Sequence, residues 1–277
     1  MAFRADIALV WVEGPDAARF LQGMLTSEVQ SLAIGAAQPS LLLSAKGRIQ
    51  GQLSVLRDGE EAFTLALPAL FAEHIVAGLA EHLVSEDAEI IGPEPVGAVL
   101  IAATDARPDG VGDLVIESDI PDAWLVIGAD TDAILAACGA PEGSPEALDL
   151  IRVMAGVPRL GVDFAVDQTL VQEAGLAPLV SFTKGCYLGQ ETVARLEHRG
   201  HANRQLRGLR LTSVAAPGAD ITRGGAVVGA LTTVASSDQF GPVGLALIRH
   251  EVEPGATVRV GGSAAEVTTL PFVADLL

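Results

Sequence analysis

The sequence predicts an α+β protein in which helices pack on a mostly antiparallel sheet, followed by a small β-barrel or sandwich. Segments typical of strands and of helices alternate through residues 1–138, which indicates helices layered on a sheet. From residue 204 onward, short β-branched segments alternate with Gly and Pro, as they do in small all-β domains. Residues 156–203 lie between these parts and show little periodicity.

The predicted sheet layer begins with a strand at residues 7–12 and a helix after the turn that follows it. Apolar residues of this helix fall on one face at helical spacing, namely Phe20, Leu21, Met24 and Leu25. Strands at 40–45 and 49–56 flank Lys46-Gly47 and predict a hairpin. Further elements in chain order are a strand at 62–67, a helix at 69–84, strands near 88–91, 96–103, 113–117 and 123–128, and helices at 131–138 and 145–156.

Composition excludes several classes of function. The chain has 17 basic and 35 acidic residues and a net charge of −18, so a broad surface for nucleic acid is not expected. No apolar run reaches the roughly 20 residues of a membrane-spanning helix, and the N-terminus lacks the features of a signal peptide. We therefore expect a cytoplasmic protein without membrane contact.

Two cysteines stand in different sequence contexts. Cys186 lies two residues after Lys184, is flanked by glycine, and precedes a helix expected to begin near Gly189. A neighbouring cation and a helix N-terminus favour the thiolate, although a buried packing role is the alternative. Cys138 ends an apolar helix with no basic neighbour, which indicates a core residue.

Segments along most of the chain resemble one known family. They are FLQGMLTSEV (20–29), SAKGRIQGQLSV (44–55), GVPRLGVDF (156–164), TLVQEAGL (169–176), KGCYLGQE (184–191) and LPF (270–272). In this order they resemble the YgfZ family of folate-binding proteins, which act in iron–sulfur cluster maintenance and tRNA modification. The KGCYLGQE segment is the most specific of them.

The resemblance implies an aminomethyltransferase-like three-lobed ring with folate near its central channel. Residues 1–203 would form the folate-binding α+β region and residues 204–277 a C-terminal β-barrel domain. Within the first region, a split domain of about 1–45 and 144–203 would surround a ferredoxin-like insertion of about 46–143.

The same scaffold is that of the glycine cleavage T-protein, an aminomethyltransferase. The resemblance places an Asp pair of that enzyme at Gly51-Gln52 of this chain. A glutamine cannot act as a carboxylate in proton transfer, and the T-protein pattern lacks the KGC cysteine. Whether the protein is an enzyme is therefore left open.

The resemblance also implies site residues. Cys186, aided by Lys184, would be a redox-active or cluster-handling thiol. Glu173 would accept two parallel N–H bonds from the pterin edge of tetrahydrofolate, or else be an ordinary loop residue. The other implied folate contacts are Tyr187, Gln190, Glu191 and Arg195. No metal site is predicted, because Cys186 with His198 and His201 fits no ordinary zinc spacing.

Three hypotheses of function follow. The leading one is a folate-binding accessory protein for iron–sulfur client proteins, including tRNA-modifying enzymes. The second is a folate-dependent one-carbon transferase acting on an amine. The third is a protein scaffold with folate as a structural ligand.

Basic residues concentrate in one stretch of this acidic chain. Residues 184–210 contain six basic residues against Glu191 and Glu197: Lys184, Arg195, Arg199, Arg204, Arg207 and Arg210. These residues predict a basic rim that binds an anion, either the polyglutamate tail of a folate or the acidic surface of a client protein. The alternative is that they form ion pairs with acidic residues elsewhere in the chain.

Overall fold

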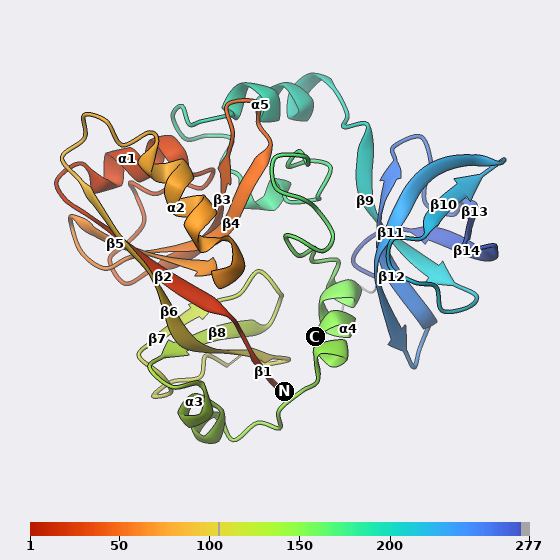
Figure 1. The fold of residues 1–277 in the computed structure, drawn as a ribbon, viewed down its shortest axis with the longest axis horizontal. Helices are drawn as coiled ribbons and strands as arrows, with labels where there is room; N and C mark the ends of the chain where they lie inside the picture. Colours follow the sequence, from red (N-terminus) through yellow and green to blue (C-terminus); the bar gives the residue numbers. More distant parts are fainter. Residues whose placement is uncertain (105, 273–277) are drawn as a thin grey trace. The chain divides into compact units, whose positions relative to one another are not determined.

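The computed structural model describes residues 1–104 and 106–272. The chain forms two compact units. The first contains residues 1–142 and 177–194, and the second contains residues 143–176 and 195 onward. Both units are shown in Figure 1.

The first unit is built on one antiparallel sheet. Its strands are β1 (Ala2–Arg4), β2 (Ile7–Glu13), β3 (Ala37–Leu43), β4 (Ile49–Arg57), β5 (Ala62–Pro68), β6 (Glu89–Ala102), β7 (Leu114–Glu117) and β8 (Ala123–Gly128). They run in the order β3-β4-β5-β2-β6-β8-β7, and β1 pairs with β6. The pairs between these strands are antiparallel, as the sequence predicts.

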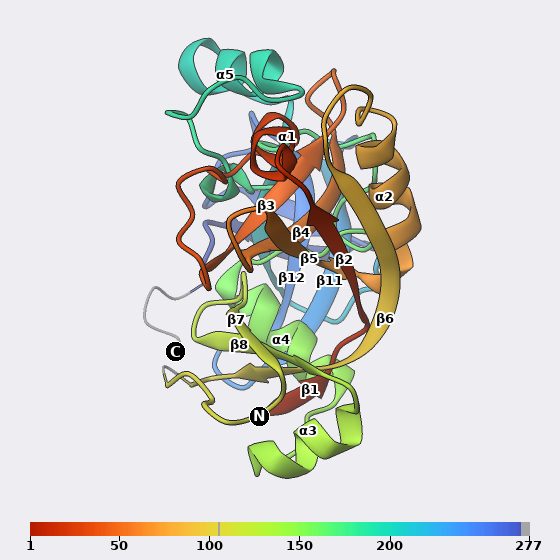
Figure 2. The same ribbon diagram turned by 90° about the vertical axis from the view of Figure 1, so that its left-hand side faces the viewer.

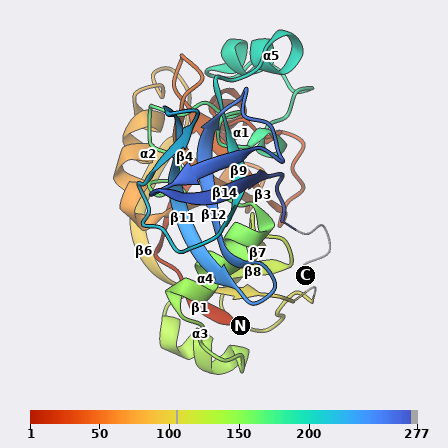
Figure 3. The same ribbon diagram turned by 90° about the vertical axis from the view of Figure 1, so that its right-hand side faces the viewer.

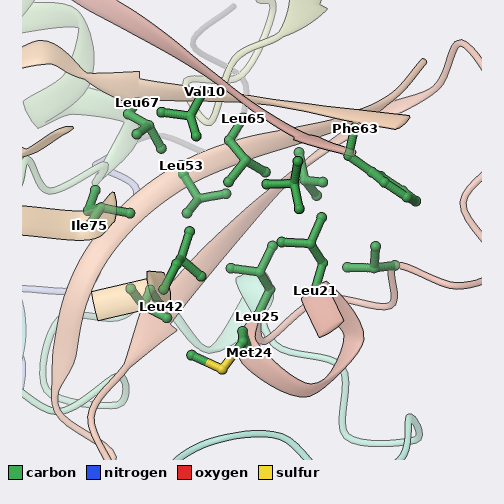
Figure 4. Packing of buried hydrophobic residues seen from close by; sticks show 14 of the residues in the cluster. Val10, Leu21, Met24, Leu25, Leu42, Leu53, Phe63, Leu65, Leu67 and Ile75 are labelled. Carbon is green, nitrogen blue, oxygen red and sulfur yellow. The ribbon is translucent and has the colours of Figure 1, made fainter. Parts of the chain in front are cut away.

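Helices of this unit cover an apolar face of the sheet. They are α1 (Ala17–Met24), the short 3-10 helix η1 (Ala69–Phe71), α2 (Ala72–Ala80) and α3 (Thr131–Cys138). Leu21 and Leu25 face the strand residues Leu53 and Leu65 in one buried cluster (Figure 4). Removing each such side chain from water stabilises the fold by about 1.5–3 kcal/mol. The apolar residues predicted for one face of the first helix are therefore the ones that are buried against the sheet.

Two elements differ from the sequence-based expectation. The strands predicted near 88–91 and 96–103 are a single strand, β6, which pairs with β2 in its first half and with β8 in its second (Figure 2). The Gly92-Pro93-Glu94-Pro95 stretch looks like a break, but a register shift between Leu9 and Trp11 of β2 accommodates it. The helix predicted at 69–84 is shorter, because α2 ends at Ala80.

The second unit contains a helix and a closed barrel. Helix α4 (Pro145–Ala155) begins after Ser144, whose hydroxyl accepts from the Ala147 N–H, and ends at Gly156 in the left-handed conformation. The barrel strands are β9 (Arg204–Leu211), β10 (Asp220–Arg223), β11 (Ala226–Ser237), β12 (Gly241–Arg249), β13 (Thr257–Val260) and β14 (Ser263–Thr268). They close in the order β10-β11-β12-β9-β14-β13. Strands β9, β11, β12 and β14 of this barrel are labelled in Figure 3.

A buried ion pair joins α4 to this barrel. Arg152 Nη1 lies 2.5 Å from Asp163 Oδ2, and its Nη2 donates to Thr233 Oγ1 at 2.7 Å. The Thr232 hydroxyl donates to the other Asp163 oxygen at 2.5 Å. Losing one partner of a buried pair typically costs about 3–5 kcal/mol, because the remaining charge stays buried. The network thus anchors the segment after α4 to β11.

Candidate functional site

The segment that carries Cys186 is hydrogen-bonded to the last turn of α1 and to the residues just after it. The Ser181 N–H donates to Thr26 O, and the Leu188 N–H donates to Gly23 O, each at 2.9 Å. The Thr26 hydroxyl in turn donates to Leu179 O at 2.8 Å, next to the short 3-10 helix η2 (Ala177–Leu179). Backbone bonds therefore hold this segment on both sides of the cysteine.

Lys184 adds a buried link between the same two parts of the chain. Its ammonium donates to Leu25 O at 2.7 Å and to Ser27 O at 2.6 Å, and lies 5.3 Å from the centre of the Tyr187 ring. Burial lowers the pKa of Lys184 to about 8, against the opposing charge of Glu28. Burial likewise raises the pKa of Tyr187 to about 12. The lysine charge is thus directed at two backbone carbonyls.

Two glycines allow the predicted hairpin to lie against this segment. Gly189 has φ +81°, and a Cβ placed on it would lie 2.5 Å from Ser44 O. Gly47, at the hairpin turn, has φ +73° and would bring a Cβ within 2.7 Å of Thr192 Cβ. Only glycine fits both the backbone conformation and the close approach. Helix α5 (Gln190–Arg199) starts directly after Gly189, near the residue that the sequence predicts.

Cys186 is exposed and lines a cavity of about 610 Å³. The cavity is also lined by three residues expected at the site: Tyr187, Gln190 and Glu191. Cys138, in contrast, is half-buried against an apolar cluster, and desolvation raises the pKa of its thiol. It is therefore less enclosed than the core position that the sequence predicts.

The cavity contains three polar residues that sequence reasoning did not find. Arg19, His82 and Glu86 line it together with the cysteine segment. Arg19 forms an ion pair with Asp16 at 2.9 Å, and the Glu86 carboxylate accepts from the N–H groups of residues 84 and 85. None of them stands in a motif, so no local signal could have indicated them. Together with Glu191, they surround an accessible thiol with one guanidinium, one imidazole and two carboxylates.

Glu173 and Arg195, the other predicted site residues, belong to the second unit. Glu173 is buried, and its Oε2 accepts from the Leu170 N–H at 3.1 Å. The Arg204 guanidinium also donates to this carboxylate, at 3.2 Å and 3.4 Å. Arg195 is exposed on α5.

Gly51 and Gln52, where the resemblance places the Asp pair, lie on β4. A Cβ on Gly51 would approach Ile75 Cγ1 to 2.5 Å, so this position has no room for an aspartate while Ile75 packs there. Gln52 Nε2 donates to Asp119 Oδ2 at 2.5 Å. The sequence gives no sign of this contact, because the two residues are 67 positions apart.

The prediction of a basic rim is wrong for Lys184, because its side chain is buried and donates to backbone carbonyls. Among the arginines, Arg204 pairs with Glu173, and the Arg210 guanidinium lies 4.5 Å from the centre of the Phe240 ring. The side chain of Arg199 lies outside the described part of the structure. Pairing with other groups thus accounts for part of the basic excess.

The described residues lack two features: a cluster of side chains that could hold a metal ion, and a helix that could cross a membrane. No group of three or more His, Cys, Asp or Glu side chains there is arranged to hold a metal ion. His201 stacks on His250, with ring centres 3.9 Å apart. No helix in residues 1–104 or 106–272 is long and apolar enough to cross a membrane.

Comparison with known proteins first defines the class. Residues 6–97 match the family model described as the GCVT N-terminal domain. The crystal structure of the glycine cleavage system aminomethyltransferase T from Bartonella henselae matches with a TM-score of 0.83 at 21% identity, over 98% of this chain and 86% of that one. The chain therefore has the aminomethyltransferase fold, which confirms the predicted α+β class with a C-terminal barrel.

Sequence relatives then define the family. The iron-sulfur cluster assembly factor IBA57, mitochondrial, of Mus musculus is 31% identical over 290 residues, covering 91% of this chain and 78% of that protein. The tRNA-modifying protein YgfZ of Edwardsiella ictaluri is 34% identical over 229 residues, covering 72% of this chain and 67% of that protein. The chain belongs to the family of YgfZ and IBA57, as the sequence motifs predict.

Proposed function

We propose that this protein is a folate-binding accessory factor for the assembly or repair of iron–sulfur clusters, including those of tRNA-modifying enzymes. The observation that carries the proposal is the exposed Cys186 at a cavity, in a segment fixed by Lys184 and Gly189. The relatives support it by name, since one is a cluster assembly factor and the other a tRNA-modifying protein. The partners in this proposal are iron–sulfur client proteins, and the effect on tRNA passes through them.

Cys186 is the proposed reactive group, and Lys184 positions it. The thiol is exposed, whereas the ammonium of Lys184 is buried on the carbonyls of Leu25 and Ser27. Lysine therefore acts by holding the loop in place. Both cysteines are free thiols, which suits a reducing compartment and supports a cytoplasmic site of action.

Tetrahydrofolate is the proposed cofactor. When bound, it supplies a redox-active pterin that also carries one-carbon groups. Glu173 fits the pterin edge in part, because Arg204 and Leu170 already donate three hydrogen bonds to its carboxylate. A carboxylate has about four acceptor positions, so a second pterin bond requires Arg204 to move. Tyr187, Gln190, Glu191 and Arg195 remain proposed contacts.

The one-carbon transferase hypothesis has less support. Its Asp pair would fall on Gly51 and Gln52, and Ile75 fills the space that a side chain at residue 51 would need. The KGC cysteine, which the transferase pattern lacks, is exposed in this chain.

Genetic complementation tests the proposal. Cys186→Ala should fold normally, because the side chain is exposed, and should fail to restore iron–sulfur-dependent tRNA modification in a bacterial strain lacking its own YgfZ. Cys138→Ala is the matched control and should restore it. Equal rescue by both variants would refute the role of Cys186.

A further inference from the structure

The cavity at Cys186 carries more negative than positive charge. Its lining includes the carboxylates of Glu86 and Glu191 and one guanidinium, that of Arg19. The guanidinium is already paired, because its Nη2 lies 2.9 Å from Asp16 Oδ2 and its Nε donates to Oδ1 at 3.3 Å. No ion pair among the described residues includes Glu86 or Glu191. The accessible thiol is therefore in an acidic environment.

The carboxylate of Glu86 is held in place as a charged group. Its Oε2 accepts from the Ser85 N–H at 3.0 Å and from the Val84 N–H at 3.2 Å. The bond from Ser85 is the main cause of the lowered pKa of Glu86, to which the bond from Val84 and the charge of Arg19 add. The carboxylate is thus ionised at neutral pH without a salt bridge of its own.

The imidazole of His82 adds an acceptor to the same cavity. Its Nδ1 lies 3.0 Å from Gly78 O, and a carbonyl oxygen can only accept, so Nδ1 bears the hydrogen. In the neutral ring, Nε2 is then an acceptor. Phe20 and Met24 give the cavity an apolar part, which suits the methylene chain of a lysine or an arginine. A cationic side chain therefore finds acceptors for its N–H groups and apolar surface for its stem.

An anionic occupant is disfavoured by the same groups. Helix α5 begins at Gln190, and the N-terminus of a helix attracts anions. Here Glu191 stands in the first turn of the helix and offsets that attraction. The whole chain has a net charge of −18, which also steers cationic partners toward it and repels anionic ones.

We propose that the cavity at Cys186 is a docking site for a lysine- or arginine-rich segment of the client protein, whose cationic side chains bind Glu86, Glu191 and His82. Charge complementarity carries the proposal. It rests on the proposed function and deepens it, because it assigns the chemistry of the client surface that meets the thiol. The assigned charge is opposite to that of the acidic client suggested by the basic stretch of residues 184–210.

Disulfide exchange with three matched peptides tests the proposal in the full-length protein carrying Cys138→Ala. The peptides have a central cysteine, activated as its 2-pyridyl disulfide, between pairs of lysine, glutamine or glutamate. The Cys186 thiolate attacks the peptide sulfur and forms a new S–S bond, while pyridine-2-thiolate leaves with the bonding electrons and takes up a proton. The absorbance of the released pyridine-2-thione gives the rate.

The lysine peptide should react about fivefold faster than the glutamine peptide, and the glutamate peptide should be slower by a similar factor, as expected for exposed charges that act through water. The differences should shrink in about 0.5 M salt, because salt screens exposed charges. Equal rates for all three peptides, or a faster glutamate peptide, overturn the inference and leave the accessible thiol intact. A glutamine peptide that fails to react with the folded protein overturns the proposed role of Cys186 as well.

Single variants test whether the cavity residues set this preference. The ratio of the lysine-peptide rate to the glutamine-peptide rate is compared, because losing a carboxylate also changes the thiolate fraction of Cys186. Glu86→Gln and Glu191→Gln should each lower the ratio to about two, whereas Arg19→Gln should raise it to about ten. Glu117→Gln is the control at an exposed residue of β7 and should keep the ratio of the parent. An unchanged ratio in both Glu86→Gln and Glu191→Gln overturns the docking site.

Discussion

Glu173 and Arg204 form an ion pair in which both carboxylate oxygens face one guanidinium, with Nε 3.2 Å from Oε1 and Nη2 3.4 Å from Oε2. The Glu173 side chain is 7% exposed and that of Arg204 is 43% exposed. The arginine is the accessible partner, so a ligand that needs the carboxylate has to compete with it.

Replacing the carboxylate should weaken folate binding. Glu173→Gln leaves one acceptor where there were two, and losing a charge-assisted hydrogen bond costs roughly 1.5–3 kcal/mol, or about ten- to a hundredfold in affinity. Calorimetry with tetrahydrofolate measures the change. Arg204→Gln, the companion variant, removes the competing guanidinium and should bind at least as tightly as the parent. Similar losses in both variants would contradict competition between Arg204 and the pterin.

The stability of the protein should depend on pH through Lys184. Its pKa is 10.5 in an unfolded chain and about 8 in the fold, so between these values the unfolded state binds more protons. The free energy of unfolding therefore rises with pH across this window, by on the order of 3 kcal/mol for the whole shift. Below about pH 8 both states are protonated, and Lys184 adds no slope.

Urea unfolding of Lys184→Met between pH 7 and 9.5 isolates this contribution. The variant should lack the rise that the parent shows, and the upper limit stays below pH 10, where Tyr187 begins to act in the opposite direction. Lys46→Met, at the other lysine of the chain, should behave like the parent because Lys46 is exposed on the hairpin turn. If the free energy of unfolding changes with pH in the same way in all three proteins, the lowered pKa of Lys184 is refuted.

The two cysteines should differ in reactivity. Cys186 is exposed, whereas Cys138 is half-buried and its pKa is raised by desolvation, which lowers its thiolate fraction. Iodoacetamide should alkylate Cys186 roughly tenfold faster in the folded protein, as followed by peptide mass spectrometry. In urea the two rates should converge. Faster labelling of Cys138 in the folded protein would show that Cys138, and not Cys186, is the accessible thiol.

Gly189 should be needed for the position of the cysteine segment. Gly189→Ala places a Cβ 2.5 Å from Ser44 O at φ +81°, and should lower the free energy of unfolding by at least about 1–3 kcal/mol. Its Cys186 alkylation rate should also change, since the loop and hairpin must separate. Gly185→Ala is the control, because a Cβ there meets no atom within 4 Å and the φ value is not positive. Equal stability of both variants would contradict the close packing.

Local sequence patterns were sufficient for most of the secondary structure and for the exposure of Cys186. The spacing of Phe20, Leu21, Met24 and Leu25 places all four on one face, and these residues bury against the sheet. Helical periodicity reports which side of an element is apolar, so helices and strands with one buried face are the predictable elements. The glycine-flanked Cys186 in its motif indicated an accessible thiol, and the structure has it exposed.

Tertiary structure decided which groups surround the predicted residues. Lys184 looked like a surface cation beside Cys186, but the carbonyls of Leu25 and Ser27 bind its ammonium and it is buried. Gln52 meets Asp119 only because the sheet brings the β3–β4 hairpin and the turn after β7 together. Contacts between residues far apart in the chain depend on strand order and register, and no local pattern encodes the pair. The sequence by itself therefore determined the fold class and the accessible cysteine, and only the packing of the sheet and loops decided which charges are buried and which are exposed.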